Sequence, residues 1–162
     1  MINSCDITIW SLGNIARTIT EVPTVFNIVS IRSSNIPQKE YGAFEKYRRN
    51  YKDITIEFFD DIRIPVDGHI TPSQESIGRI LKWAEKRKHI AVHCTAGISR
   101  SSAIAYLIAC QRTSPKHAVK ILDPAKHSPN LLILNLGAEI LGNKSVSTEY
   151  VKWFEKAFSR FS

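Results

Sequence analysis

The stretch from residue 101 to residue 110 most constrains the fold of this 162-residue chain, because it is apolar on nearly every side. A helix that is hydrophobic all round is buried all round. Residues 90–92 form a short apolar run just before it, and we predict that they are a buried strand. The sequence therefore predicts a buried strand, a tight loop over residues 93–100 and a buried helix, in that order.

Other segments predict an α/β fold around this unit. Three further strands are predicted at residues 6–10, 25–31 and 54–59 from their apolar pattern. Capping residues predict helices that begin at Thr71, Ser114, Ser128 and Ser147. We expect one domain over residues 1–162, with a central, mostly parallel sheet of four to five strands flanked by helices. Such sheets bind ligands where a strand leads into a helix, which here is the predicted tight loop.

Composition indicates the class of protein. Apolar residues make up 43% and charged residues 23% of the chain, which is ordinary for a globular protein. Asp6 and Asn14 interrupt the only apolar stretch near the N-terminus, and no run approaches the roughly 18 to 20 apolar residues of a membrane-spanning helix. We therefore expect a cytoplasmic protein without a membrane span. The net charge of +7 favours encounters with anions.

The cysteines argue against a disulfide framework and against a zinc site. Only three are present, Cys5, Cys94 and Cys110, and no two of them form a Cys-x-x-Cys pair. The histidines lack metal-ligand spacing, so no metal site is predicted. Cys5 and Cys110 are expected to be packed thiols. Cys94 differs from them, because a His precedes it and an Arg follows closely.

The predicted loop and the residues on either side of it read His-Cys-Thr-Ala-Gly-Ile-Ser-Arg-Ser. Gly97 gives the loop the freedom to curl, so that its backbone N–H groups converge at a helix N-terminus and bind an anion. The same groups stabilise a thiolate at Cys94, which is a strong nucleophile and a competent leaving group. The planar fork of Arg100 can hold two phosphoryl oxygens. His93 can orient the loop, and Ser101 can donate to the Cys94 sulfur.

This string resembles the His-Cys-x5-Arg-Ser/Thr signature of the cysteine-based protein tyrosine phosphatases, and is similar to their small dual-specificity, bacterial-type branch. The resemblance implies the phosphatase P-loop fold and hydrolysis of a phosphate monoester through a phosphocysteine intermediate. It implies no metal and no organic cofactor. The implied partner is a phosphorylated protein or a small phosphate ester, and no nucleic acid. The implied phosphate ligands are Arg100 and the loop residues Thr95, Ala96, Gly97, Ile98 and Ser99.

Expulsion of the leaving group needs a proton donor, which similar phosphatases supply from an Asp on a loop before the Cys. Asp60 and Asp61 follow the third predicted strand, and adjacent carboxylates there cannot both point into the site. Because a similar Phe-Asp-Asp string in small dual-specificity phosphatases uses the second Asp, the resemblance favours Asp61. Asp60 and Asp67, the latter in a predicted turn, are the alternatives. Pro129-Asn130 resembles a Pro-Asn pair of that branch, so Asn130 either hydrogen-bonds near the loop or fills the first turn of a helix.

Other functions stay open on the sequence. One is an inositol phosphate or phosphoinositide phosphatase, although many of these place Lys inside the loop, which is uncharged here. A second is a non-catalytic phosphate-binding module on the same fold. A third is a rhodanese-like sulfurtransferase, against which His93 and Arg100 argue. The basic run at residues 46–52 is predicted to be a solvated helix face, with a patch for acidic substrates as the alternative.

Overall fold

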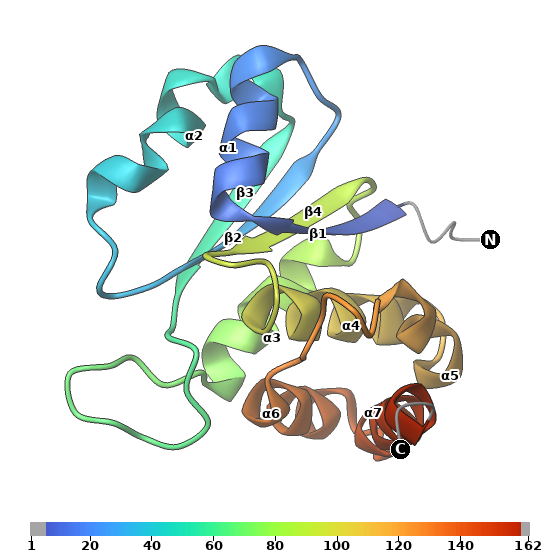
Figure 1. Cartoon of the computed structure of the whole chain (residues 1–162). Coiled ribbons are helices and arrows are strands. Elements are labelled where there is room, and N and C mark those ends of the chain that lie inside the picture. The colour runs from blue at the N-terminus through green and yellow to red at the C-terminus, as the bar shows by residue number, and fades with distance from the viewer. Residues whose placement is uncertain (1–5, 160–162) are drawn as a thin grey trace.

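Four strands pair into one parallel sheet in the computed structural model, which describes residues 6–159 (Figure 1). Their order across the sheet is β1-β4-β2-β3. The bounds are Ile7–Ser11 for β1, Asn27–Arg32 for β2, Asp53–Phe58 for β3 and Ile90–Cys94 for β4. Every residue of the central strands β2 and β4 is buried, as expected of parallel strands covered on both faces. The predicted α/β class and mostly parallel sheet are confirmed.

Helices cover both faces of this sheet (Figure 1). α1 and α2 lie on one face, and α3 to α7 lie on the other. The α-helices are α1 (Leu12–Glu21), α2 (Gly42–Lys46), α3 (Gln74–Ala84), α4 (Arg100–Arg112), α5 (Pro115–Ala118), α6 (Leu131–Leu141) and α7 (Ser145–Phe158). Three short 3-10 helices are η2 (Gln38–Tyr41), η3 (Arg48–Asn50) and η4 (Val119–Ile121).

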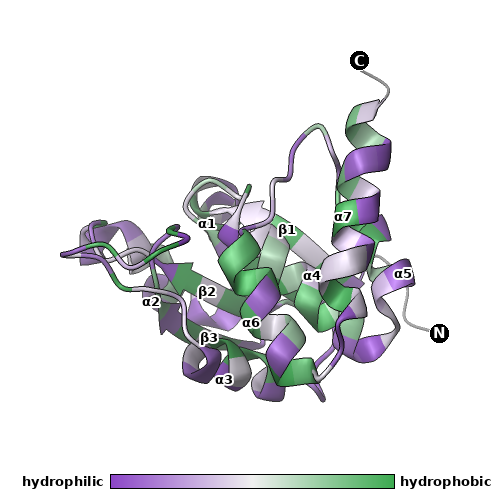
Figure 2. Cartoon of the chain, turned by 90° about the horizontal axis from the view of Figure 1, so that it is seen from below, coloured by the Kyte–Doolittle hydropathy of each residue, from purple (hydrophilic) through white to green (hydrophobic). Residues whose placement is uncertain are grey.

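The sheet separates two hydrophobic cores, because successive side chains of a strand point to opposite faces. Val29 and Val92 belong to the larger core, which lies around α4. Ile28 and Ala91 belong to the smaller core with α1 and α2. All residues of α4 up to Cys110 are buried, which confirms the prediction of an enclosed helix. Figure 2 shows hydrophobic residues gathered on α4 and α6, where the two helices pack together.

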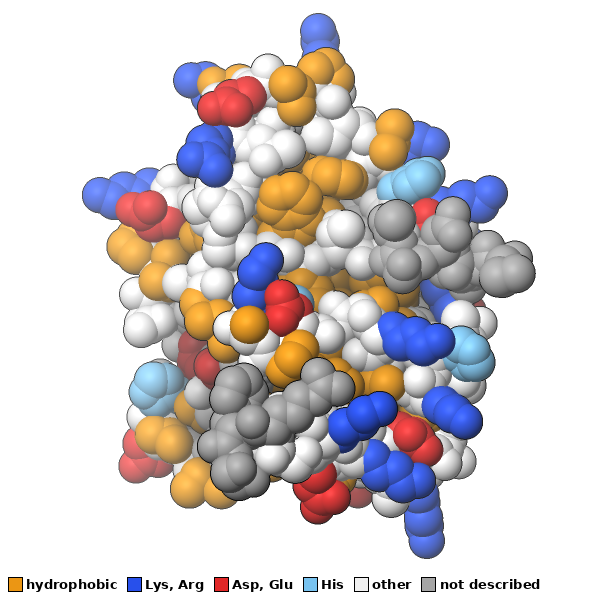
Figure 3. Space-filling model, turned by 45° about the vertical axis from the view of Figure 1, so that its right-hand side comes forward, with side chains coloured by type: hydrophobic (Ala, Val, Ile, Leu, Met, Phe, Trp, Pro, Cys, Tyr) orange, Lys and Arg blue, Asp and Glu red, His pale blue; other side chains and the backbone are white. Residues whose placement is uncertain are grey.

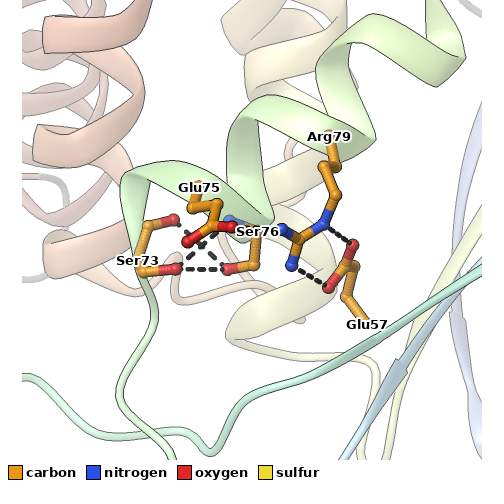
Figure 4. Close-up of polar contacts among 5 residues, drawn as sticks. All are labelled: Glu57, Ser73, Glu75, Ser76 and Arg79. Carbon is orange, nitrogen blue, oxygen red and sulfur yellow. Dashed lines mark hydrogen bonds and ion pairs between the residues drawn. The ribbon is translucent and has the colours of Figure 1, made fainter.

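Polar contacts join α3 to the sheet (Figure 4). Ser73 caps the helix, because its hydroxyl accepts a hydrogen bond from the Ser76 N–H at 3.1 Å. Arg79 donates from Nε to one oxygen of Glu57 on β3 at 2.7 Å and from Nη2 to the other at 3.0 Å. A bidentate pair fixes direction as well as distance. The loop that runs from β3 to α3 is therefore held at both of its ends.

Some predicted details of the helices were wrong. α3 is capped by Ser73 and not by Thr71, and α6 is capped by Asn130 and not by Ser128. α7 begins at Ser145, two residues earlier than predicted. The sequence patterns also gave no indication of α1 and α2. These differences leave the order of strands and helices around the predicted loop unchanged.

Burial raises the pKa of the Cys110 thiol to about 12, which agrees with the predicted packed thiol. Cys5 lies outside the described residues. Within residues 6–159, none of the helices has the length and apolarity that crossing a membrane requires.

Candidate active site

The loop between β4 and α4 consists of residues 95–99 and is called the 95–99 loop below. Three of its carbonyl groups point away from the loop, since they accept hydrogen bonds at 3.0–3.2 Å from the N–H groups of Leu12, Ser128 and Asn130. Its own backbone N–H groups donate to none of the described residues. A loop with outward carbonyls and unused N–H groups at a helix N-terminus is suited to bind an anion.

Gly97 allows this loop to pass close to the end of β1. Its φ of +72° lies in the left-handed region. A Cβ at this position would lie 2.7 Å from the backbone nitrogen of Ser11 and 2.8 Å from the carbonyl carbon of Trp10. The predicted need for glycine at the turn therefore has two causes, the backbone conformation and the closeness of β1.

Cys94 is the last residue of β4, and its side chain is 2% exposed. Its sulfur lies 3.1 Å from the hydroxyl oxygen of Ser101, in the first turn of α4. A hydroxyl at this distance can donate to a thiolate. The predicted contact between Ser101 and Cys94 is therefore present.

Arg100 is buried, and its guanidinium joins three segments of the chain. Nη1 donates to the hydroxyl of Ser33 at 2.7 Å and to the carbonyl of Phe59 at 2.9 Å, and Nη2 donates to the hydroxyl of Thr95 at 3.2 Å. Its Nε has no partner, and no other buried side-chain nitrogen or oxygen of residues 6–159 is left without one. A buried donor without an acceptor is costly, so this atom marks where a ligand oxygen can bind.

His93 is fully buried below the 95–99 loop and is held by hydrogen bonds at both ring nitrogens. Nε2 lies 2.7 Å from the hydroxyl of Ser30, which itself accepts from Arg32 Nε at 3.0 Å. Nδ1 lies 3.3 Å from the Cys94 carbonyl, and the ring stacks on Phe44. Burial, together with the charges of Arg32 and Arg100, lowers the pKa of His93 to about 3. His93 is therefore neutral at physiological pH and can orient the backbone at Cys94.

Asp60 connects the start of the loop that follows β3 to Ile70, later in the same loop, and to Ser34. Its carboxylate accepts hydrogen bonds from the N–H and the hydroxyl of Ser34 and from the N–H of Ile70, and it lies 3.4 Å from His69. Burial acts to raise the pKa of Asp60, but the hydrogen bonds from Ser34 and Ile70 outweigh it and lower the pKa overall. An ionised carboxylate with this many donors has a structural role and is poorly suited to release a proton.

Asp61 points instead toward the 95–99 loop. Its Oδ1 accepts from the hydroxyl of Ser99 and from the side-chain amide of Asn130, each at 2.8 Å. Its Oδ2 makes no hydrogen bond with the described residues. Asn130 also caps α6 through a hydrogen bond from the N–H of Ile133 at 3.1 Å. Both alternatives for Asn130 are therefore realised, because one side chain caps the helix and holds Asp61.

Some of these groups border a pocket of about 300 Å³ at the carboxyl ends of the strands, whereas Cys94 is not among its lining residues. Among its lining residues are Asp61, Thr95 and Arg100 from the predicted site and Ser33 and Ile36 from the segment after β2. Asp67 is exposed and does not line it. In Figure 1 the segments that follow β2 and β3 project on the same side of the molecule.

The sequence as a whole was compared with known proteins. Residues 18–135, which are most of the chain, match the family model described as "Dual specificity phosphatase, catalytic domain". The chain belongs to the dual-specificity phosphatase family. It is thus a phosphatase of the protein-tyrosine-phosphatase superfamily, in the hydrolase class.

Several solved structures are similar to this phosphatase, among them the two that follow, and no match was found among curated proteins. Tk-PTP in its active form is 15% identical over 83% of this chain and 90% of that chain, with a TM-score of 0.48. PTPMT1 is 17% identical over 85% of this chain and 92% of that chain, also with a TM-score of 0.48.

The structure also places beside these groups residues that the sequence analysis did not single out. Ser33 accepts from Arg100 and lies 3.2 Å from the Thr95 hydroxyl, and Ser30 and Arg32 support His93. All three lie at the carboxyl end of β2, which pairs with β4. The polar run that follows the apolar residues of the second predicted strand was the available signal, because the ends of neighbouring parallel strands meet.

The basic run at residues 46–52 lies away from the pocket. Lys52 donates its N–H to the carbonyl of Phe26, just before β2 begins, so this run is at the amino end of the sheet. Arg48 is occupied by the carbonyls of Tyr51 and Lys52. The predicted helix face is wrong, because only Lys46 belongs to α2, Arg48–Asn50 form η3, and Tyr51 is buried. The position of the run also argues against a patch for substrates of this pocket.

Proposed function

We propose that this phosphatase hydrolyses phosphate monoesters of proteins or small molecules through a phosphocysteine intermediate on Cys94. The observation that carries the proposal is the set of unused donors that follow Cys94 in the chain, namely the N–H groups of the 95–99 loop and Nε of Arg100. Donors that remain unpaired in a folded protein call for a ligand with several acceptor oxygens. A phosphoryl group supplies three, and its charge matches Arg100 and the N-terminus of α4.

In the first step the Cys94 thiolate attacks phosphorus, and a sulfur–phosphorus bond forms as the bond to the leaving oxygen breaks. Nε and one terminal nitrogen of Arg100 hold two equatorial oxygens. Asp61, in its protonated form, gives its proton to the leaving oxygen. Its Oδ2 is suited to carry that proton, because Oδ1 is held by Ser99 and Asn130.

In the second step a water molecule attacks phosphorus and passes a proton to the Asp61 carboxylate. The sulfur–phosphorus bond breaks, and inorganic phosphate and the thiolate are released. The hydroxyl of Ser101, 3.1 Å from the sulfur, donates to the departing thiolate and makes it a better leaving group. This returns Cys94 and Asp61 to their starting states without a cofactor.

The other residues predicted for the site fit this proposal as binding and positioning groups. Thr95, Ala96, Gly97, Ile98 and Ser99 bind phosphate through their backbone, and neutral His93 positions the Cys94 carbonyl. We treat residues 1–162 as one phosphatase domain. A reducing compartment such as the cytoplasm suits it, because the nucleophile must stay a thiol. The proposed partner is a phosphorylated substrate and not a nucleic acid.

The test compares the unmodified protein with Cys94→Ser and Cys110→Ser on a soluble aryl phosphate. We expect Cys94→Ser to lose turnover while it still binds inorganic phosphate. Cys110→Ser is the matched control, since it makes the same change at a buried thiol outside the pocket, and it should keep turnover. Turnover by Cys94→Ser would refute the mechanism. Phosphate binding without turnover by the unmodified protein would indicate a non-catalytic module.

A further inference from the structure

A second hollow adjoins the 95–99 loop on the side of β1. Its volume is about 470 Å³, and it is lined by Ile9, Trp10, Ser11, Asn14, Ala96, Gly97, Ile98, Ala125, Lys126 and His127. Another hollow of about 450 Å³ shares five of these residues and reaches the start of β1 at Ile7. The two form one groove, called the β1 groove below, that runs from the 95–99 loop along the whole strand.

One wall of the β1 groove is the free edge of the sheet. β1 pairs only with β4 among the described strands, so half of its backbone N–H and C=O groups have no ladder partner. Exposed edge strands bind extended peptides by main-chain hydrogen bonds. Five residues of strand are about 16 Å long at the rise of a β-strand, which is the length of an extended segment of about five residues.

The opposite wall is a fixed turn that carries a single positive charge. Asp123 holds this turn, because its carboxylate accepts from the N–H of Ala125 at 2.9 Å and its own N–H donates to Nδ1 of His127 at 2.9 Å. The Ser128 N–H ties the turn to the carbonyl of Ile98 at 3.0 Å. The position of Lys126 beside the 95–99 loop is therefore built into the fold.

Among residues 6–159, Lys126 is the one Lys, Arg, Asp or Glu that lines the part of the groove next to the 95–99 loop. Burial lowers the pKa of His127, so that ring is neutral at physiological pH. Asp123 is the only acid that lines either part of the groove, and it lines only the part farther from the loop. In Figure 3, which turns this side of the molecule forward, the surface is hollowed across its middle, with hydrophobic side chains inside and charged side chains of both signs around it.

We propose that the β1 groove binds an extended segment of a phosphoprotein substrate, and that Lys126 recognises an acidic side chain close to the phosphorylated residue. The segment adds to the edge of β1 through its backbone, while its phosphorylated residue enters the 95–99 loop. The proposal names the substrate class of the site and rests on the proposed phosphatase activity. An extended peptide fits better than a compact small ester, because the groove is long and is continuous with the loop.

The first experiment measures kcat/KM for a phosphopeptide with Glu next to the phosphorylated residue and for the same peptide with Gln there. We expect the Glu peptide to be preferred about two- to fivefold, as for an ion pair at the surface, because Lys126 is exposed. The preference should shrink at high salt. Lys126→Gln should remove the preference. Lys116→Gln on α5 is the matched control, because it removes the same charge outside the groove and should leave the preference unchanged.

The second experiment measures binding of the Glu phosphopeptide and of its backbone N-methylated form to the Cys94→Ser protein. N-methylation removes the donors needed to pair with β1, so we expect the methylated peptide to bind more weakly than the unmethylated one. Lys126→Gln should weaken binding by a different factor, because it removes a side-chain contact and no backbone donor. Equal Glu preference in Lys126→Gln and Lys116→Gln, equal binding of the methylated peptide, or a dimer that closes this edge would overturn the inference. Turnover of an aryl phosphate is measured for every variant as a control. If all variants except Cys94→Ser keep it, a negative result on the peptides contradicts the β1 groove and not the proposed phosphatase activity.

Discussion

At the scale of single residues, the site is defined by which polar atoms have partners and which do not. Asp60 accepts several hydrogen bonds, whereas Oδ2 of the adjacent Asp61 is unused. Arg100 is bonded through both terminal nitrogens but not through Nε. Satisfied groups hold the structure, and the unsatisfied ones are the groups left to act on a ligand.

Replacement of Asp60 and replacement of Asp61 are therefore expected to have different effects. Asp61→Asn should lower kcat for a substrate with a poor leaving group by roughly 10²- to 10⁴-fold, with little change in stability. Asp60→Asn should lower the free energy of unfolding by about 1–3 kcal/mol, because its donors lose a charged acceptor. Steady-state kinetics and urea unfolding of both variants measure the two effects. A larger loss of kcat in a folded Asp60→Asn protein would reverse the assignment.

The neutral state of His93 predicts a dependence of stability on pH. The unfolded chain protonates this group below its ordinary pKa of 6.5, while in the folded protein its pKa is about 3. The unfolded state then binds more protons, so the free energy of unfolding should fall by up to about 1.4 kcal/mol per pH unit as the pH drops below 6.5. Urea unfolding at several pH values measures this slope.

His93→Asn is the comparison for that slope. Burial lowers the pKa of His127 as well, so the slope should decrease in the variant without disappearing. Asp60 acts only at lower pH, since its pKa is already below the ordinary value of 3.8. An unchanged slope in His93→Asn would show that His93 is not neutral in the folded protein.

At the scale of elements, the site depends on the junction where β4 turns into α4. Gly97→Ala adds a Cβ within 3 Å of β1 and forces a left-handed conformation, which alone costs about 1–2 kcal/mol. We expect lower stability and strongly reduced turnover, because the loop must move away from β1. Gly78→Ala in α3 is the control, with nothing within 4 Å of the added Cβ, and it should stabilise by about 0.5–1 kcal/mol. Thermal unfolding and aryl phosphate turnover test both, and normal turnover in Gly97→Ala would contradict the geometry described here.

Helix starts near the site show the limit of local sequence patterns. Ser128 and Asn130 are both good N-cap residues, and the Pro between them favours the earlier start. In the structure the Ser128 N–H is bonded to the 95–99 loop, and Asn130 caps α6 while it holds Asp61. The choice between them is made by contacts distant in sequence, which no local pattern contains.

At the scale of the whole molecule, the sequence predicts the strands and the buried helix because their segments are rich in apolar residues. The parallel direction is typical of strands that are separated by helices. The order β1-β4-β2-β3 was not predicted, because it depends on contacts between strands distant in sequence. α1 was not predicted, because only Ile15 and Ile19 of its residues are buried and its threonines favour strands. The residues that connect Arg100 to Ser33 and to Phe59 could not be predicted either, since they become neighbours only when the sheet forms.

The most direct measurement of the central claim is to trap the covalent intermediate. Ser101→Ala removes the hydroxyl beside the sulfur and should slow the second step more than the first. After acid quenching of its reaction with an aryl phosphate, mass spectrometry should find one phosphoryl group on the peptide that contains Cys94. Steady turnover with the phosphoryl group on another residue, or with no covalent adduct under any quench, would contradict a thiolate nucleophile at this position.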